Sequence, residues 1–299
     1  MRPRDEPAHV PVAERGTSLG ADAWRRLKRN RMAIAGGVTL AVIALACALL
    51  PLLPGMDYAK MNPADKNLAP SFAHLLGTDA LGRDYLARVL VGGRMSLLVG
   101  LAATLSVVVV GVLYGAIAGY YGGRIDDVMM RFVDFLYGIP YMFLVILVML
   151  MFDDESRRNP LPVFFALGLV QWLAMARIVR GQVLALRGQE FVHAARIVGA
   201  SDARIILRHI LPNVVGVVVI YATLTVPAVI ILESFLSYLG LGMSLSWGQL
   251  VAEGVGVVNP IESYWWLLTW PSLLLALTLF SLNFLGDGLR DALDPRTRR

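Results

Sequence analysis

The feature that most constrains the fold of this chain is a series of apolar windows long enough to cross a lipid bilayer. A helix rises about 1.5 Å per residue, so roughly 20 residues span the ~30 Å hydrocarbon core. Six windows reach or approach this length: Met32–Leu53, Met95–Ala118, Phe132–Phe152, Leu161–Ala176, Val214–Leu236 and Tyr264–Leu285. The fourth is short, and it spans only if it includes Asn159 and Pro160 or continues as helix beyond Ala176. The pattern predicts an all-α, polytopic membrane protein with six transmembrane helices.

The composition supports the same class. Of the 299 residues, 57% are hydrophobic and 16% are charged, whereas a soluble domain carries about a quarter charged residues. The single cysteine, Cys47, excludes an internal disulfide framework. In so apolar a chain, the net charge of +5 indicates contact with membrane lipid, and we expect no nucleic-acid partner.

Lysine and arginine residues are distributed unevenly between the segments that join these windows. If the N-terminus lies inside, the inner segments hold eight, two, six and four of them, or 20 of the 27 in the chain. The other seven fall in the outer segments, at Lys60, Lys66, Arg83, Arg88, Arg94, Arg157 and Arg158. The positive-inside rule therefore predicts that both termini are cytoplasmic.

The same reading predicts how the chain is organised. Residues 1–24 are polar and contain proline, so we expect a disordered cytoplasmic N-terminus. Residues 25–299 then form one transmembrane domain. It includes an external segment at 54–94 and a cytoplasmic loop at 177–213.

The sequence contains no motif for energy conversion or catalysis. It lacks the phosphate-binding pattern G-x-x-x-x-G-K-[ST], so the chain does not hydrolyse nucleotide on its own. The histidines have no partners at metal-ligand spacing, so we expect no metal site. A membrane-embedded enzyme would need such a cluster.

A secondary transporter or a channel of another class is the alternative. Transporters driven by ions keep ionisable groups deep in their spans, where a charge is costly and persists for function. Here Asp134 and Glu233 lie near span ends, and we expect no paired charge inside the membrane. The sequence therefore favours a conduit that is driven from elsewhere.

The basic segment that joins the fourth and fifth windows predicts a helix-turn-helix platform. From Arg187 it reads RGQEFVHAARIVGASDARIILRHILPN. Gly199 can adopt the left-handed conformation that reverses the chain. Ser201 or Asp202 can cap a second short helix, and Pro212 can begin the next one.

Two uses of this platform fit its residues equally well. Ala194 and Ala195 permit close approach by another protein, and six apolar residues supply contact area: Val192, Ile197, Val198, Ile205, Ile206 and Ile210. Alternatively, the segment is an amphipathic helix that rests on lipid headgroups. Four arginines suit that second use: Arg187, Arg196, Arg204 and Arg208.

This segment resembles the EAA loop of the membrane subunits of ABC importers, whose pattern is E-A-A, three residues, G, nine residues and I-x-L-P. Five residues match in register: Ala194, Ala195, Gly199, Leu211 and Pro212. His193 stands where the family has glutamate, and His209 where it has isoleucine. The resemblance implies that the loop is a coupling helix that docks on an ATPase subunit. Glu190 can then replace the family's glutamate, and His193 introduces a group that titrates near neutral pH.

Five further segments resemble the peptide/nickel group of these permeases, in particular the C-type subunit of oligopeptide or dipeptide systems. They are GTDALGRDYLARVLVGGRMSLLVG from Gly77, GYYGGRIDDVMMR from Gly119, ARIVRGQ from Ala176, ESFLSYLGLG from Glu233 and NFLGDGLRDALDP from Asn283. Oligopeptide, dipeptide, nickel-chelate and glutathione importers share these motifs. Among these substrates, the C-type resemblance favours peptides.

The resemblance also implies an assembly and a mechanism. We expect the type I ABC importer permease fold, in the inner (plasma) membrane of a bacterial cell. The partners are a homologous second permease subunit, two ATPase subunits, an extracytoplasmic substrate-binding protein and the peptide substrate. The chain needs no cofactor of its own, because the ATPase subunits bind ATP. Transport then proceeds by alternating access.

Three residues are candidates for the translocation path. We expect Pro140 and Pro227 to interrupt the third and fifth helices and to free backbone groups toward a polar interior. Either proline can instead relieve packing strain. Glu233 is the third candidate. The glycine-containing sequence SYLGLGMSLSWGQ, from Ser237, is expected either to contact the binding protein or to form a packed cap.

Overall fold

The computed structural model describes residues 24–152, 160–258 and 262–293. Apart from the largely irregular segment at 53–84 and shorter turns, these ranges are helical. They contain one isolated bridge, between Thr78 and Asp84, so the all-α prediction is confirmed. Five of the described helices are long and apolar enough to span a membrane, and there are six such segments if a bent helix pair is counted as one span. The predicted disorder of residues 1–24 lies outside the described residues, except at Trp24, which is helical.

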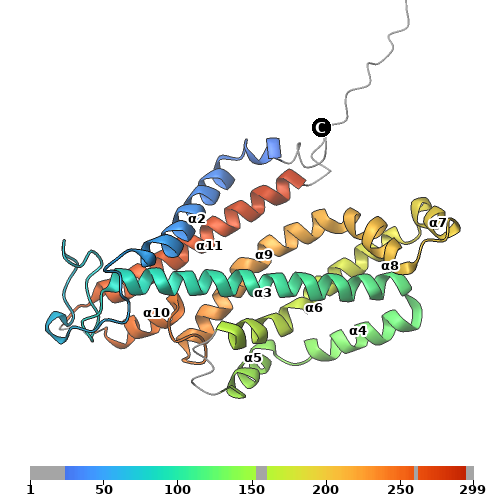
Figure 1. The fold of residues 1–299 in the computed structure, drawn as a ribbon. Coiled ribbons are helices and arrows are strands. Elements are labelled where there is room, and N and C mark those ends of the chain that lie inside the picture. The colour runs from blue at the N-terminus through green and yellow to red at the C-terminus, as the bar shows by residue number, and fades with distance from the viewer. Residues whose placement is uncertain (1–23, 153–159, 259–261, 294–299) are drawn as a thin grey trace, which may run out of the picture.

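Four of the five long helices pack against the fifth, α3, which runs most of the length of the molecule (Figure 1). The five are α2 (Arg31–Leu49), α3 (Tyr85–Tyr121), α6 (Pro160–Leu186), α9 (Leu211–Tyr238) and α11 (Trp265–Leu293). Helix α6 packs along α3, and α2 packs along α11. The shorter α7 (Glu190–Ile197) lies at one end of the molecule, and α10 (Trp247–Gly256) lies toward the other.

The contact between α3 and α6 is built on glycines. Gly111, Gly115 and Gly119 recur every fourth residue and form one face of α3. A Cβ atom at Gly115 would collide with the carbonyl of Ala176, and one at Gly119 would press on the carbonyl of Arg180. Small residues at this spacing let two membrane helices approach closely, so this face fixes the position of α6.

Helix boundaries differ from the prediction where charged residues belong to a helix. The second span begins at Tyr85 rather than Met95, because Arg88 is buried and paired and therefore interrupts only the hydropathy, not the helix. The fourth span continues to Leu186, since Arg177 and Arg180 are also paired. The expectation that this span extends beyond Ala176 is thus confirmed, and residues 177–186 of the predicted loop are helical.

The third window is interrupted at Pro140, as predicted. It consists of α4 (Gly123–Tyr137) and α5 (Tyr141–Leu150), which meet at 80°. Pro140 lacks an N–H and disfavours helical geometry in the residue before it, so the chain breaks there. Pro227 behaves differently, because α9 continues as helix through it. The predicted interruption therefore holds for Pro140 only.

The outer surface of α2 is apolar. Large hydrophobic side chains on this helix are 43–60% exposed: Met32, Ile34, Val38, Val42, Leu45 and Leu49. Cys47, on the opposite side, is buried with Trp247 and Trp266 in a core that joins α2, α3, α10 and α11. An exposed helix surface without charge is suited to lipid tails.

Candidate functional site

The first candidate site is the predicted platform, whose first helix is closed by a regular C-terminal turn. Gly199 follows α7 with φ +84°, so the predicted left-handed glycine is confirmed. The amide of Ala200 donates to the carbonyl of Ala195 at 3.0 Å, and the amide of Gly199 donates to the carbonyl of Arg196 at 2.9 Å. These two bonds form a Schellman motif, which ends the helix and reverses the chain.

The second part of the platform leads directly into α9. Ser201 occupies the predicted N-cap position of α8 (Asp202–Ile205), but its side chain makes no capping hydrogen bond there. A π-helical turn, η4 (Ile206–Ile210), follows and ends where the amide of Leu211 donates to the carbonyl of Ile206. Pro212 lies in the first turn of α9. The π-helical turn is wider than an α-helical one. It suits Pro212, which has no N–H and would crowd the carbonyl four residues earlier in a regular α-helix.

Side chains fasten the platform to the end of α3. The hydroxyl of Tyr120 donates to Oδ1 of Asp202 at 2.6 Å, and the guanidinium of Arg196 lies 5.2 Å from the centre of the Tyr120 ring. Arg187 Nη1 donates to the carbonyl of Gly119 at 3.4 Å. The platform is therefore held against α3 from both of its ends.

The apolar residues of the platform do not all face outward. Four of the six that were predicted to supply contact area lie in the core between α3, α6 and α9: Val192, Ile205, Ile206 and Ile210. That prediction was wrong for these four, because the short helices need them to bind to the rest of the bundle. Ile197 and Val198 are each 87% exposed.

The outward surface of α7 combines these two apolar residues with polar ones. Glu190, His193, Ala194 and Arg196 are exposed, whereas Ala195 is half-buried against the core. Glu190 and His193 lie one turn apart on the same side of the helix. We call the exposed residues of α7 with Val198 the platform surface. Its side chains are available to a second protein.

The candidates for a translocation path lie in two separate places. Pro140 lines a cavity of about 280 Å³ at the break between α4 and α5, together with Tyr137, Tyr141 and Gln171. Pro227 and Glu233 lie elsewhere, buried along α9.

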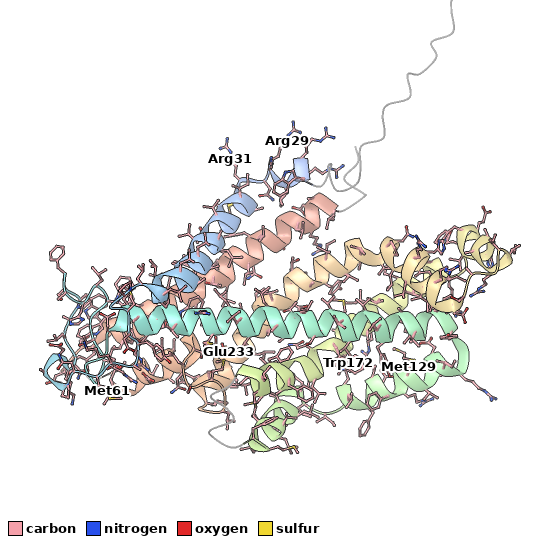
Figure 2. All side chains as sticks on the ribbon, viewed as in Figure 1. Arg29, Arg31, Met61, Met129, Trp172 and Glu233 are labelled. Carbon is pink, nitrogen blue, oxygen red and sulfur yellow. The ribbon has the colours of Figure 1, made fainter. Side chains whose placement is uncertain are left out.

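Glu233 is enclosed by hydrogen bonds rather than open to a path. Ser96 Oγ on α3 donates to its Oε2 at 3.0 Å, and Ser237 Oγ donates to its Oε1 at 2.7 Å. Ser96 Oγ also accepts from the amide of Trp247, and Ser237 Oγ accepts from the amide of Met243. This Glu233 junction ties α3, α9 and α10 together inside the bundle (Figure 2).

The loop after α9 packs on this junction. A Cβ atom at Gly242 would collide with Ser237, and one at Gly248 would collide with the backbone of Ser234. Of the two predicted uses of this loop, the packed cap fits these contacts. Helix α10, which begins within it, was not predicted, because ten residues of mixed polarity do not form a spanning window.

A second buried polar junction was also missed. Arg88 is 3% exposed, and its guanidinium binds Glu253 through both Nη atoms, at 2.6 and 3.0 Å. Its Nη1 also donates to Oδ2 of Asp79 at 2.8 Å. We call these three residues the Arg88 junction. Glu253 lies 165 positions from Arg88, so no local pattern could have linked them.

Asp79, in the segment before α3, has a lowered pKa. Burial opposes its ionisation, but backbone hydrogen bonds from Arg83 and Leu81 and the side chain of Arg83 outweigh that effect, so the pKa of its carboxyl lies below the ordinary value. Asp79, Arg83, Tyr85 and Glu253 also line a cavity of about 330 Å³. The loop is thereby locked onto α3 and α10.

Ion pairs join different helices near the ends of the predicted windows, and the prediction that no paired charge lies deep inside the membrane stays a prediction. Besides Arg88 with Glu253, Arg180 Nη2 binds Oδ2 of Asp126 at 2.6 Å, and Arg177 Nη2 binds Oδ1 of Asp134 at 2.5 Å. The last two pairs link α6 to α4. The sequence missed them because each partner lies on a different helix.

Comparisons with known proteins place the chain among transport proteins. The model of the family described as binding-protein-dependent transport system inner membrane component matches residues 111–299. A second model, the N-terminal transmembrane domain of oligopeptide transport permease C, matches residues 18–70.

Curated relatives match over nearly the whole length. The oligopeptide transport system permease protein of Escherichia coli K12 is 50% identical, covering 95% of this chain and 93% of its own length. The dipeptide transport system permease protein of Bacillus subtilis is 44% identical, covering 94% and 87%.

One solved structure shares the fold. It is the MetNI methionine ABC transporter in an inward-facing conformation, with a TM-score of 0.52 and 16% identity. The match covers 69% of this chain and 96% of the other.

Proposed function

Because the chain belongs to the family of binding-protein-dependent transport system inner membrane components, we propose that it carries oligopeptides or dipeptides into a bacterial cell as one permease subunit of an ATP-driven ABC importer. The 50% identity to an oligopeptide permease, over 95% of this chain, supports the peptide cargo. The chain is a conduit and not an enzyme. ATP is bound and hydrolysed by separate ATPase subunits, so the chain needs no cofactor of its own.

The observation that carries the proposal is the platform surface. Ile197 and Val198 are exposed at the end of a short helix, while the buried Val192 and the contact of Arg196 with the Tyr120 ring hold that helix against the bundle. An apolar tip on a firmly held helix suits a groove on another protein. Such a helix can pass on movement, because only a contact that differs between two states shifts a conformational equilibrium.

The distribution of charge supports an orientation for the whole chain. The platform and both termini belong to the segments that hold 20 of the 27 lysine and arginine residues. By the positive-inside rule we place these segments, and the ATPase subunits, on the cytoplasmic side. The loop at 54–84 and α10 then face the outside, where the substrate-binding protein delivers its cargo.

The complete importer comprises this chain, a homologous second permease, two ATPase subunits and the external binding protein. Closure of the ATPase pair moves the two platforms, and the spans turn between inward-open and outward-open states. Pro140, at the cavity in the helix break, is the candidate of the three that fits a path through the membrane. Pro227 and Glu233 support the architecture of α9.

Uptake of a labelled peptide tests the function. The chain and its four partners are produced in a bacterial strain that lacks its own peptide permeases, and uptake of radiolabelled tri-alanine is measured. We expect uptake that stops when ATP is depleted and continues when the proton gradient is dissipated. Uptake that follows the proton gradient instead would show a secondary transporter. Competition by dialanine, glutathione and a nickel chelate then ranks the substrates.

Cross-linking tests the docking surface. In the assembled importer, a cysteine at Ala194 is expected to cross-link to an ATPase subunit, because this residue lies on the platform surface. A cysteine at Leu45, on the apolar side of α2, is the matched control and should form no such link. Efficient cross-linking from Leu45 and none from Ala194 would assign the platform to the lipid surface.

A further inference from the structure

Helix α4 carries a stripe of exposed charged residues. Arg124, Asp127, Arg131 and Asp134 are spaced by three, four and three positions, so they share one face of the helix. All four are exposed in this chain. Positive and negative residues alternate along the stripe, and it runs for most of the helix. The stripe therefore presents both signs of charge to whatever lies against α4.

The neighbouring face of the same helix is apolar. Ile125, Val128, Phe132 and Phe135 follow the same spacing one position further along and are 49–70% exposed. Lipid can cover this second face but not the first, because ionisable residues in a membrane face a bundle interior or a water-filled cavity. The two stripes thus turn different sides of α4 toward lipid and toward a polar space.

Helix α6 continues the polar face. In its C-terminal half, the half-buried Gln171 and the exposed Ala174, Arg177 and Gly181 are polar or small. The exposed residues nearer its N-terminus are apolar: Leu161, Phe165 and Leu169. The Arg177 guanidinium lies 4.1 Å from the ring centre of Tyr137 and pairs with Asp134 at 2.5 Å. We call the charged stripe of α4 with Gln171 and Arg177 the polar wall.

The wall is not needed to hold the helices together. Behind it, Arg180 binds both carboxylate oxygens of Asp126, whose side chain is 7% exposed, and this pair braces α4 on α6. Tyr114 on α3 also contacts both helices: its ring packs on Trp172, and its hydroxyl donates to the carbonyl of Met129 (Figure 2). By contrast, Arg177 and Asp134 are 44% and 65% exposed. Exposed pairs contribute little to stability.

A cavity lies beside the wall at the C-terminal end of α4. The break between α4 and α5 leaves a space of about 280 Å³, lined among others by Tyr137, Tyr141 and Gln171. The Arg177–Tyr137 contact places the exposed ion pair beside this cavity. A peptide has the matching chemistry, since it carries an ammonium at one end, a carboxylate at the other, and amides between.

We propose that the polar wall is the side of the translocation path that this chain supplies. The arginines of the wall meet the peptide carboxylate, its aspartates meet the ammonium at other positions along the stripe, and the cavity at the helix break receives uncharged groups of the peptide. This inference rests on the proposed function, and it names the residues that the cargo touches. Because the wall carries both signs of charge, it suits a zwitterion better than a simple cation such as a free metal ion.

Cysteine labelling in the assembled importer tests the proposal. The chain has one natural cysteine, Cys47, which is 2% exposed and so stays unlabelled. D127C and R131C place a thiol on the wall, and V128C and F132C place one on the neighbouring apolar stripe as matched controls. We expect a charged, membrane-impermeant maleimide to modify the first two only. Tri-alanine with a non-hydrolysable ATP analogue should slow that modification at least about threefold.

Two results would overturn the inference. Unreactive thiols at 127 and 131 would mean that the second permease covers the wall. Reactive thiols whose rate ignores both peptide and nucleotide would mean that the wall faces bulk water. If the unsubstituted importer takes up no tri-alanine at all, the proposed function fails, and that result is read separately from the labelling.

Substitution of the exposed pair gives an independent measurement. R177Q and D134N each remove one charge while keeping a hydrogen-bonding group of similar size. Loss of a charged hydrogen bond to the cargo should lower tri-alanine uptake about tenfold. The amount of each variant in the membrane should remain that of the unsubstituted chain. Uptake that stays unchanged in both variants would overturn the assignment.

Discussion

Charged side chains meet in two different settings in this bundle. At the Arg88 junction the arginine is 3% exposed, whereas at the polar wall Arg177 is 44% exposed, and each is paired with a carboxylate from another part of the chain. A buried charge that loses its partner costs about 3–5 kcal/mol. An exposed pair contributes about 0–1 kcal/mol. The same residue types therefore brace the fold in one place and remain free for function in the other.

The largest effect is expected at the Arg88 junction. Arg88→Leu leaves Asp79 and Glu253 without their shared cation, so the free energy of unfolding should fall by up to about 3–5 kcal/mol. Asp79 keeps its pair with Arg83, and Glu253 is 37% exposed, so the loss stays below that of a fully buried pair. We expect little of this variant in the membrane, measured by immunoblot. Arg83→Leu is the matched control, because Arg83 is more exposed and binds Asp79 only. Normal abundance of Arg88→Leu would show that the Arg88 junction does not brace the fold.

The Glu233 junction should be the next most sensitive. Glu233→Ala takes the acceptor from Ser96 and Ser237, and unsatisfied buried hydroxyls cost about 1–3 kcal/mol. The melting temperature of the purified importer should fall, and uptake should fall in proportion to abundance. Glu233→Gln keeps an acceptor and should lose less. A loss of uptake at full abundance would instead indicate that Glu233 belongs to the translocation path.

The platform should separate transport from stability. Gly199→Val forces a branched residue into the left-handed region, which costs about 1–2 kcal/mol locally. The described residues leave open space within 4 Å of a Cβ there, so the fold should survive. Co-purification of the ATPase subunits and peptide uptake should both decrease. Gly216→Ala, in α9, has similar space without the positive φ, and both readouts should stay normal.

Acid should loosen the segment before α3. Because the pKa of Asp79 is lowered, its ionised form stabilises the fold at pH values above the ordinary pKa of 3.8. That contribution is lost as the pH falls through the lower pKa of the folded state. Limited proteolysis of residues 54–84 should therefore accelerate only in strong acid. Asp79→Asn should be cleaved faster at neutral pH and show less change on acidification.

The smallest effect on stability is expected at the polar wall. Arg177→Leu is the same substitution as at Arg88, but both members of its ion pair are exposed, so the free energy of unfolding should change by under about 1 kcal/mol. The melting temperature of the purified importer measures this. A decrease as large as that of Arg88→Leu would show that the wall is structural and would erase the contrast.

Much of the fold could be predicted from the sequence, because the length and hydropathy of a spanning helix are local properties. The windows around α2, α9 and α11 were located in this way. The early start of α3 was missed, since Arg88 resembles a loop residue until its partner on α10 is known. Helix α10 itself was missed because it does not span.

The candidate site could be predicted in part. The turn at Gly199 follows from one residue type in one context. Which apolar residues of the platform face the core could not be predicted, because Val192 and Ile197 are equally apolar and only packing separates them. The pairing of Asp134 with Arg177 likewise depends on how α4 packs against α6.

The continuity between the platform and α9 gives the molecule a mechanical property. From Asp202 to Tyr238 the chain is one continuous helical rod of 37 residues, which begins just after the turn that follows the docking helix α7 and carries the Glu233 junction near its other end. At about 1.5 Å per residue the rod is about 55 Å long. A tilt of about 5° at the ATPase contact would move its far end by about 5 Å, comparable to the ~5.4 Å pitch of a helix. The rod thus acts as a lever, and its length fixes how far its far end moves for each degree of tilt.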